Sequence, residues 1–252
     1  DEAQDIGVPE LRFLAALGAP RPDALFFAGD LGQRIFQQPF SWKALGIDIR
    51  GRSHTLKINY RTSHQIRSRA DRLLPGAIAD VDGVEESRRG TVSVFNGPPP
   101  VVRVCDDAKD EAATAAAWIR RHLDEGTLAA EIGIFVRDEP QLARARAAIE
   151  QAGQKACLLS DSVETAADCI AAGAMHLAKG LEFKAVAVMA CDDEVIPLQE
   201  RIEAVSDPSD LDEVYNTERH LLYVACTRAR DHLLVTGVDP ASEFLDDLEV
   251  GR

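Results

Sequence analysis

The 252-residue chain lacks several features that would assign it to a common class of protein. Apolar runs such as Ala185–Ala190 are far shorter than the ~20 residues that a membrane-spanning helix needs. The five cysteines include no CxxC pair, which argues against a zinc ribbon or a redox dithiol. Their odd number and wide spacing predict reduced, mostly buried thiols in a cytoplasmic protein.

Basic residues are in the minority, with 28 Lys and Arg against 42 Asp and Glu, and the formal net charge is −14. Such a total argues weakly against a nucleic-acid partner, but the charges are unevenly distributed. Residues 41–72 contain eight basic and two acidic side chains, whereas residues 192–218 contain ten acidic side chains and one arginine. The acidic segment predicts a solvated face. The basic segment fits a solvated face and a phosphate-contacting surface equally well.

The composition is otherwise that of a globular protein, because 46% of residues are hydrophobic and 28% are charged. Predicted helices and strands are connected by short segments. We expect helices at Pro9–Leu17, Ser63–Leu74, Asp107–Asp124, Pro140–Gln151 and Asp212–Ala229. We expect strands at Ala24–Ala28, His54–Ile58, Thr91–Phe95, Val101–Val104, Ile132–Val136, Lys155–Leu159, Ala171–Met175, Ala185–Ala190 and His232–Thr236. The alternation over the second half predicts an α/β fold, a parallel sheet with helices on both faces.

Two short segments near the start carry chemistry. Adjacent carboxylates at Asp1 and Glu2 suit magnesium binding together with activation of a water, although acidic pairs are also common on surfaces. Gly29–Gln33 follows a predicted strand. Its glycine lets the backbone approach a ligand and Gln33 could orient a water or phosphate oxygen, but a simple tight turn would look the same.

Three further segments combine polar groups with predicted strand or helix ends. In Asn59–Arg61 the arginine could bind phosphate and the tyrosine could stack on a base, or they could be a surface arginine beside a core tyrosine. His176–Phe183 places more polar groups in one turn than packing requires. Arg228 ends a helix, where interaction with the helix dipole is the alternative to an anion-binding role.

Together and in this order, the segments resemble the boxes of the UvrD/Rep family of superfamily 1 DNA helicases. The matching boxes are DExQD (Asp1–Asp5), GDxxQ (Gly29–Gln33), NYR (Asn59–Arg61), HxxKGLEF (His176–Phe183) and YVAxTRA (Tyr223–Ala229). The resemblance implies two RecA-like lobes with ATP between them and movement on single-stranded DNA, in the 3′-to-5′ direction favoured by the family. Residues 1–56 would end the first lobe, and residues 57–252 would form a RecA-like second lobe.

The resemblance also implies roles for single residues around ATP. Asp1 would hold Mg²⁺ and Glu2 would polarise the attacking water. Gln33 would sense the γ-phosphate, and Arg61 and Arg228 would supply positive charge to it.

Other residues would contact the nucleoside or the DNA. Tyr60 would stack on adenine, and Glu182 would reach the ribose from a turn that contains Gly180. The side chains of His176 and Arg67 would contact the DNA strand. Phe40 or Trp42 would replace the family's base-stacking tryptophan, with packing in a core as the alternative.

The chain departs from the family in three places. It contains no GxxxxGK[ST], so we expect no ATP hydrolysis without a further N-terminal half that carries this phosphate loop. Ala174 stands where the family usually has threonine. The short stretch between Leu159 and Ala174 leaves no room for an inserted domain. Two alternatives remain: a degenerate module that binds nucleic acid or a partner without ATPase activity, and a generic P-loop-type α/β protein with another substrate.

Overall fold

The computed structural model describes residues 1–18, 21, 23–35, 40–49, 51–79, 81–83, 85–87, 90–160 and 168–249. Its centre is a six-stranded parallel sheet with the strand order β5-β10-β9-β6-β8-β7. The strands are β5 (Val101–Cys105), β6 (Ile132–Val136), β7 (Ala156–Leu158), β8 (Ile170–Ala174), β9 (Phe183–Val188) and β10 (Ala229–Val238). Every residue of β6 and β8 is buried, as expected for strands covered on both faces.

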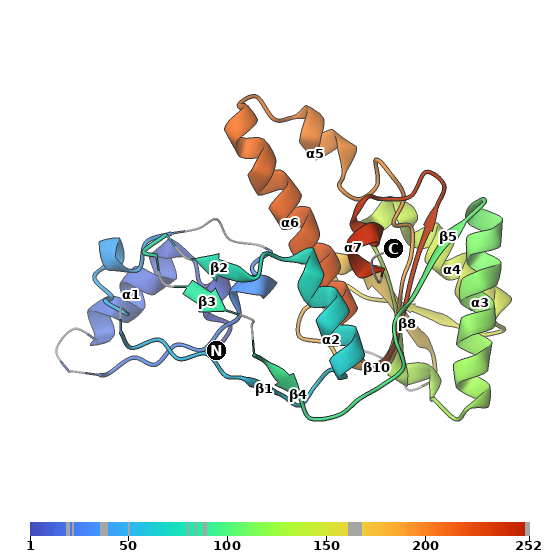
Figure 1. Ribbon diagram of the computed structural model, residues 1–252, viewed down its shortest axis with the longest axis horizontal. Coiled ribbons are helices and arrows are strands. Elements are labelled where there is room, and N and C mark those ends of the chain that lie inside the picture. Colours follow the sequence, from blue (N-terminus) through green and yellow to red (C-terminus); the bar gives the residue numbers. More distant parts are fainter. Residues whose placement is uncertain are drawn as a thin grey trace.

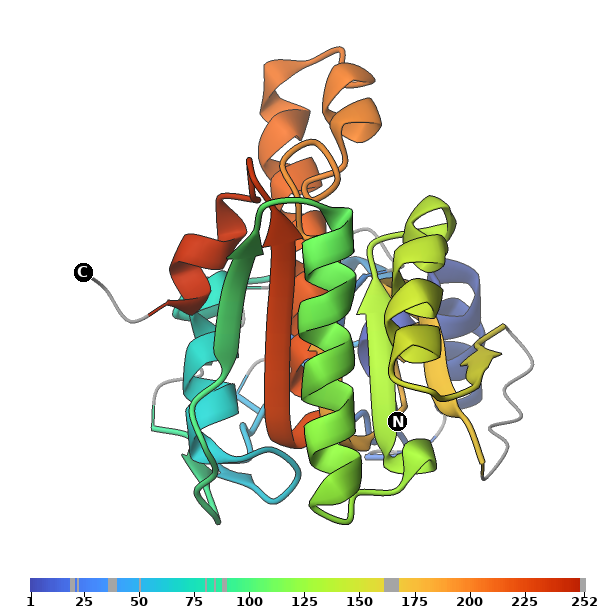
Figure 2. The same cartoon turned by 90° about the vertical axis from the view of Figure 1, so that its right-hand side faces the viewer.

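Helices cover both faces of this sheet (Figures 1 and 2), which confirms the predicted α/β class. On one face lie α3 (Ala108–Asp124) and α4 (Leu142–Gln151), which share a core with β6, β8 and β9. On the other face, α2 (His64–Ala70), α6 (Pro208–Thr227) and α7 (Phe244–Leu248) build a second core. Helix α5 (Gln199–Glu203) and the N-terminal half of α6 project beyond the sheet.

Several smaller elements complete the described structure. These are α1 (Val8–Gly18), the parallel pair β1 (Ile58–Asn59) and β4 (Val92–Ser93), and the antiparallel pair β2 (Ala77–Ala79) and β3 (Glu85–Ser87). The 3₁₀ helices are η1 (Ala3–Asp5), η2 (Leu31–Gln33), η3 (Lys43–Leu45), η4 (Asp71–Leu73), η5 (Ala129–Glu131), η6 (Glu139–Gln141) and η7 (Met175–Ala178). The N-terminal segment has a small core of its own around Leu11 and Trp42.

Local signals predicted some elements well. Asp107 caps α3 by accepting hydrogen bonds from the N–H groups of Lys109 and Asp110, both at 2.8 Å. The strand predicted at Ala24–Ala28 is wrong, because this segment belongs to no strand or sheet. Phe26 in its middle is 91% exposed. An apolar run forms a strand only where a neighbouring strand pairs with it. Here the carbonyl of Ala28 accepts from the N–H of Ala3 at 2.9 Å, and Ala3 lies in a 3₁₀ helix.

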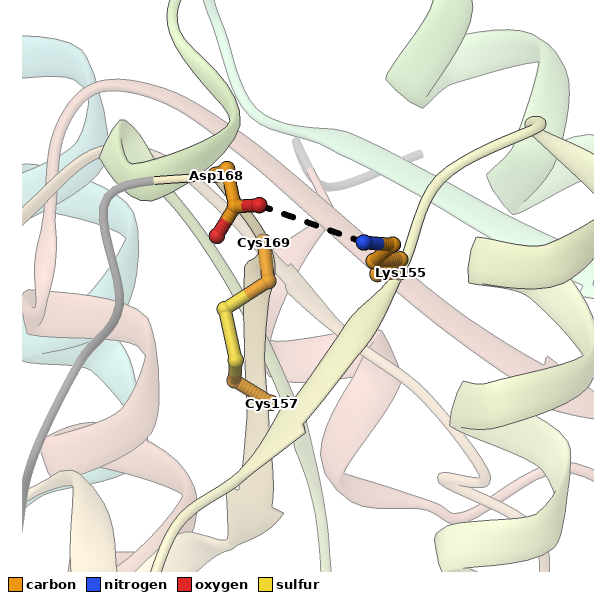
Figure 3. Close-up of a disulfide and its surroundings, with 4 residues drawn as sticks. All are labelled: Lys155, Cys157, Asp168 and Cys169. Carbon is orange, nitrogen blue, oxygen red and sulfur yellow. Dashed lines mark ion pairs between the residues drawn. A yellow bond between two sulfur atoms is a disulfide. The ribbon is translucent and has the colours of Figure 1, made fainter.

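The expectation of reduced cysteines is wrong for one pair, because Cys157 and Cys169 form a disulfide (Figure 3). Their Cα atoms are 5.7 Å apart because β7 and β8 are neighbours in the sheet, which a spacing of 12 residues does not reveal. Cys105, Cys191 and Cys226 are free and buried, as expected. The cytoplasmic location stays a prediction. Within the described residues, we find no helix long and apolar enough to cross a membrane.

Candidate functional site

Side chains from three of the predicted boxes line one cavity of about 520 Å³. Gln33 lies on η2, and Tyr60 and Arg61 lie in the turn after β1. Arg228 is the first residue after α6. The fold therefore brings together residues that are as many as 195 positions apart in sequence. This convergence makes the cavity the candidate site.

Arg228 is a buried cation at the wall of the cavity, with 2% of its surface exposed. Its Nε donates to the carbonyl of Val224 at 3.0 Å and its Nη2 donates to Oε1 of Gln33 at 3.2 Å. Burial lowers the pKa of Arg228, and the nearby positive charge of Arg61 lowers it further. These hydrogen-bond partners are all uncharged oxygens, so an anion in the cavity would complement the guanidinium.

Gln33 is oriented by the turn in which it lies. Asp30 caps η2 by accepting from Gly32 N–H at 2.8 Å, and its other oxygen accepts from Nε2 of Gln33 at 2.9 Å. The amide oxygen of Gln33 is thereby directed to Arg228. Gly29 leaves room for this turn, because a Cβ atom at its position would lie 2.5 Å from Oε1 of Gln4.

A second turn presents Tyr60 and Arg61. Asn59 Oδ1 accepts from the N–H groups of Arg61 and Thr62 at 2.8 and 3.0 Å, which forms a local Asx-type turn. The Tyr60 side chain is 71% exposed, so its ring is available for stacking. Arg61 Nε lies 3.0 Å from the Glu182 carboxylate, an ion pair that joins this turn to the segment after Gly180, whose φ is +79°.

The Asp1–Asp5 segment lies beside the turn before β9, where Lys179 contacts it. Glu2 adopts a left-handed backbone conformation with φ of 52° and accepts a hydrogen bond from Nε2 of Gln4. Asp1 and Glu2 are exposed, and Lys179 Nζ lies 2.5 Å from the Asp5 carboxylate. Among the described residues, we find no group of three or more potential metal ligands. Magnesium typically uses one or two carboxylates with phosphate oxygens, so this pair fits such a site.

The predicted DNA contacts have different surroundings. His176 is exposed on η7. Trp42 is 9% exposed, with its ring centroid 5.2 Å from that of half-buried Phe40, so the pair packs in a core. Arg67 is 8% exposed and its Nη1 donates to Asp71 at 2.6 Å. The local structure thus favours packing roles for Phe40, Trp42 and Arg67.

Two buried ionic groups escaped the sequence analysis. Lys179 belongs to a recognised box, yet its contacts with the N-terminal segment follow only from the tertiary fold. Glu218 is fully buried and receives hydrogen bonds from Arg137 and Arg201, which are distant in sequence. A charged residue within an otherwise apolar helical stripe was the available signal for Glu218.

The fold and the arrangement of these boxes define an α/β domain of the kind found at the C-terminus of helicases. Residues 149–239 match the family described as the UvrD-like helicase C-terminal domain, which confirms the resemblance seen in the boxes. Residues 149–239 of this chain are therefore similar to a UvrD-like helicase C-terminal domain.

Curated relatives and a solved structure support this assignment. The ATP-dependent DNA helicases UvrD2 of Mycobacterium bovis and Mycobacterium tuberculosis are each 31% identical over 158 residues. These alignments cover 61% of this chain but only 22% of the relatives, so the chain spans about a fifth of their length. The crystal structure of the C-terminal domain of a possible DNA helicase from Lactobacillus plantarum WCFS1 is similar in fold, with a TM-score of 0.52 and 20% identity. That similarity covers 76% of this chain and 94% of the other.

Proposed function

We propose that the chain supplies the second RecA-like lobe, and the end of the first, to an ATP-dependent helicase or translocase that moves on single-stranded DNA. Residues 1–56 belong to the first lobe and residues 57–252 to the second in this proposal. The observation that carries it is the buried Arg228 guanidinium, which bonds to Gln33 at 3.2 Å in a cavity shared with Arg61 and Tyr60. A doubly cationic pocket beside an exposed aromatic ring suits a nucleoside triphosphate.

The proposed work of the pocket is to stabilise charge on the γ-phosphoryl group. Arg228 is already desolvated and fixed by carbonyl groups, so it needs little rearrangement when negative charge develops on the phosphoryl oxygens. Arg61 is more exposed and is held by Glu182, whose carboxylate would turn to the ribose hydroxyls. Because Gln33 bonds directly to Arg228, a phosphate that draws Arg228 away would also release Gln33.

The remaining roles concern the two ends of the bound nucleotide. Tyr60 would stack on adenine, and Gly180 would leave space beside the ribose because nothing lies within 4 Å of its missing Cβ. Asp1 would hold Mg²⁺, which when bound supplies charge neutralisation to the phosphates. Glu2 would accept a proton from the attacking water. His176, exposed on η7, would contact the DNA strand.

The test requires a longer protein that joins this segment to a lobe with a phosphate loop. In it we expect Arg228→Gln and Arg61→Gln each to lower kcat for DNA-stimulated ATP hydrolysis about 10²-fold or more. KM for ATP should change much less, because the charge matters most in the transition state. Arg103→Gln is the matched control, since Arg103 is exposed on β5 and does not line the cavity. An unchanged kcat in both pocket variants, with the fold intact, contradicts the proposal.

A second candidate is a degenerate module that binds nucleic acid or a partner without ATPase activity, and a longer protein that carries no GxxxxGK[ST] upstream of Asp1 would support it. Both candidates predict that the 252-residue chain alone releases no phosphate from ATP, so they separate only in the longer protein. DNA-stimulated hydrolysis there supports the motor. Nucleotide binding that is sensitive to Arg228→Gln but gives no turnover supports the module.

A further inference from the structure

Lys179 joins the second-lobe turn to the N-terminal segment through three contacts. Its Nζ lies 2.5 Å from the Asp5 carboxylate, 3.8 Å from the Glu2 carboxylate and 2.9 Å from the main-chain carbonyl oxygen of Gln33. The side chain is 9% exposed. None of the roles proposed above uses this lysine, although it lies in the same turn as His176 and Glu182.

The burial of the ammonium group needs explanation. Lysine side chains usually pack their methylene stems against the protein and keep the charge in water. Burying an ammonium is costly unless carboxylates or carbonyl groups satisfy its three donors. Glu2, Asp5 and Gln33 all belong to the N-terminal segment, so docking of that segment on the second lobe stabilises the position of Lys179.

The direction of Lys179 is fixed by the backbone around it. The residue follows η7, and the N–H of Leu181 donates to the carbonyl of Ala178 at 3.1 Å, which closes the turn. Gly180 adopts φ of +79° within this turn, a conformation that favours glycine. The turn therefore presents Lys179 to Asp5 and Gln33 without relying on the flexibility of its side chain alone.

Gln33 is consequently held at two points by the second lobe. Lys179 binds its main-chain oxygen at 2.9 Å and Arg228 binds its side-chain oxygen at 3.2 Å. The same ammonium group contacts the segment that carries Glu2. We infer that Lys179 is a positioning residue that keeps Glu2 and Gln33 in register with Arg228. This inference rests on the proposed function for its catalytic consequence but not for its structural one.

The structural part is tested by hydrogen exchange on the full 252-residue chain without nucleotide. The amides of Ala3 and Gln33 are bonded to the carbonyls of Ala28 and Asp30, both at 2.9 Å, and report on the docked segment. Loss of a charge-assisted hydrogen bond in Lys179→Met should speed their exchange about tenfold or more. Amides of β6 and β9 should exchange as before. Lys155→Met is the control, because Lys155 is 82% exposed and its carboxylate partner is 4.0 Å away.

A conservative variant and a second substitution separate positioning from general stabilisation. Lys179→Arg keeps the charge and should restore exchange to within about threefold of the parent chain. In an Asp5→Asn background, Lys179→Met should have a much smaller additional effect, because the two residues share one interaction. Equal acceleration throughout β6 and β9, unchanged exchange at Gln33, or full additivity would overturn the inference.

The catalytic part is measured in the longer protein with a phosphate loop. We expect Lys179→Met to lower kcat about tenfold while KM for ATP stays within about threefold, and Lys179→Arg to recover part of the loss. A normal kcat in Lys179→Met overturns the inference. If the unsubstituted longer protein hydrolyses no ATP, the proposed function fails, while the exchange result still decides whether Lys179 holds the two segments together.

Discussion

At the scale of single residues, Glu218 shows how one buried carboxylate joins three segments. Its oxygens accept from Arg137 at 2.5 and 2.6 Å and from Arg201 at 2.9 Å, and it is fully buried on α6. Arg137 follows β6 and Arg201 lies on α5. Glu218 thus connects the sheet to the projecting helices.

We expect Glu218→Ala to lower the free energy of unfolding by about 3–5 kcal/mol, because it leaves the buried Arg137 without its counter-charge. Arg201→Ala should cost less than about 1 kcal/mol, since Arg201 is 39% exposed and water can solvate the site. Urea denaturation of both variants measures the difference. Equal, small losses would show that the buried pair contributes little.

His122 makes stability dependent on pH. It is buried on α3 against Trp118 and His232, and burial followed by the charge of His232 lowers its pKa to about 4 from 6.5. Arg121 also lowers this pKa, whereas Glu125 raises it. Between those two pH values the unfolded chain binds a proton that the folded chain does not. The stability that the protein gains by keeping His122 buried and neutral is therefore fully present above pH 6.5. It is lost as the pH falls towards 4.

We expect the free energy of unfolding to fall by on the order of 2–3 kcal/mol between pH 7.5 and pH 4 because of His122. Urea titrations at several pH values measure it, and His122→Phe should remove this part of the pH dependence while keeping an aromatic ring beside Trp118. Carboxylates that titrate in the same range contribute equally to both proteins and cancel in the comparison. An identical pH profile in His122→Phe would contradict the assignment.

At the scale of elements, the arginines of α2 and η4 hold the fold together. Arg67 donates to Asp71 at 2.6 Å and to Ser93 at 3.1 Å, and Arg69 donates to the carbonyl of Leu248 at 2.7 Å. The basic segment thus contacts α7 and β4. Arg67 and Arg69 therefore bind other parts of the fold, although the sequence made a phosphate-contacting surface equally reasonable.

For α2 we expect Arg67→Ala to cost about 1–3 kcal/mol of stability, because Asp71 loses a charge-assisted hydrogen bond. The salt dependence of DNA binding should not change, since a buried guanidinium contacts no phosphate. Arg72→Ala is the control, because Arg72 is exposed and its Nη1 donates to the carbonyl of Glu249 at 2.6 Å. A shallower salt slope in Arg67→Ala at unchanged stability would restore the DNA-contacting role.

The disulfide belongs to the same scale because it joins the edge strand β7 to β8. Cys157 and Cys169 are separated by 12 residues, and a loop of this size predicts a stabilisation of about 3 kcal/mol in the chain-entropy description. We expect Cys157→Ser with Cys169→Ser to lower stability by about that amount under oxidising conditions. A reductant should destabilise the parent chain but not the double variant. Equal stability of the parent chain with and without reductant would contradict the prediction.

For the whole molecule, the charge distribution governs DNA binding. With a net charge of −14, we expect the isolated chain to bind single-stranded DNA only weakly. The affinity should fall with salt at a slope of log K against log salt of about −0.7 per phosphate contacted. His176→Ala should weaken DNA binding, whereas His54→Ala, which changes an exposed histidine in the segment before β1, should not. Fluorescence anisotropy with an oligonucleotide measures both, and salt-independent binding would contradict the expectation.

The sequence by itself determined the α/β class, the position of β6 and α3, and the boxes that form the candidate site. Strand β6 was predicted with its observed bounds because its five apolar residues carry a purely local signal. Asp107 marked the start of α3 for the same reason, since a helix cap depends on neighbouring residues. Gln33, Tyr60, Arg61 and Arg228 were found by their motifs, and they line one cavity.

Only the tertiary structure decided which partners each side chain has. The strand order brings Cys157 to Cys169, and the docking of residues 1–33 on the turn before β9 surrounds Lys179 with acceptors. The predicted strand at Ala24–Ala28 is absent because a strand requires neighbours that a local pattern cannot supply. Trp42 and Arg67 are buried because residues distant in sequence pack against them. Burial and charge pairing depend on residues distant in sequence, so they emerge only once the chain has folded.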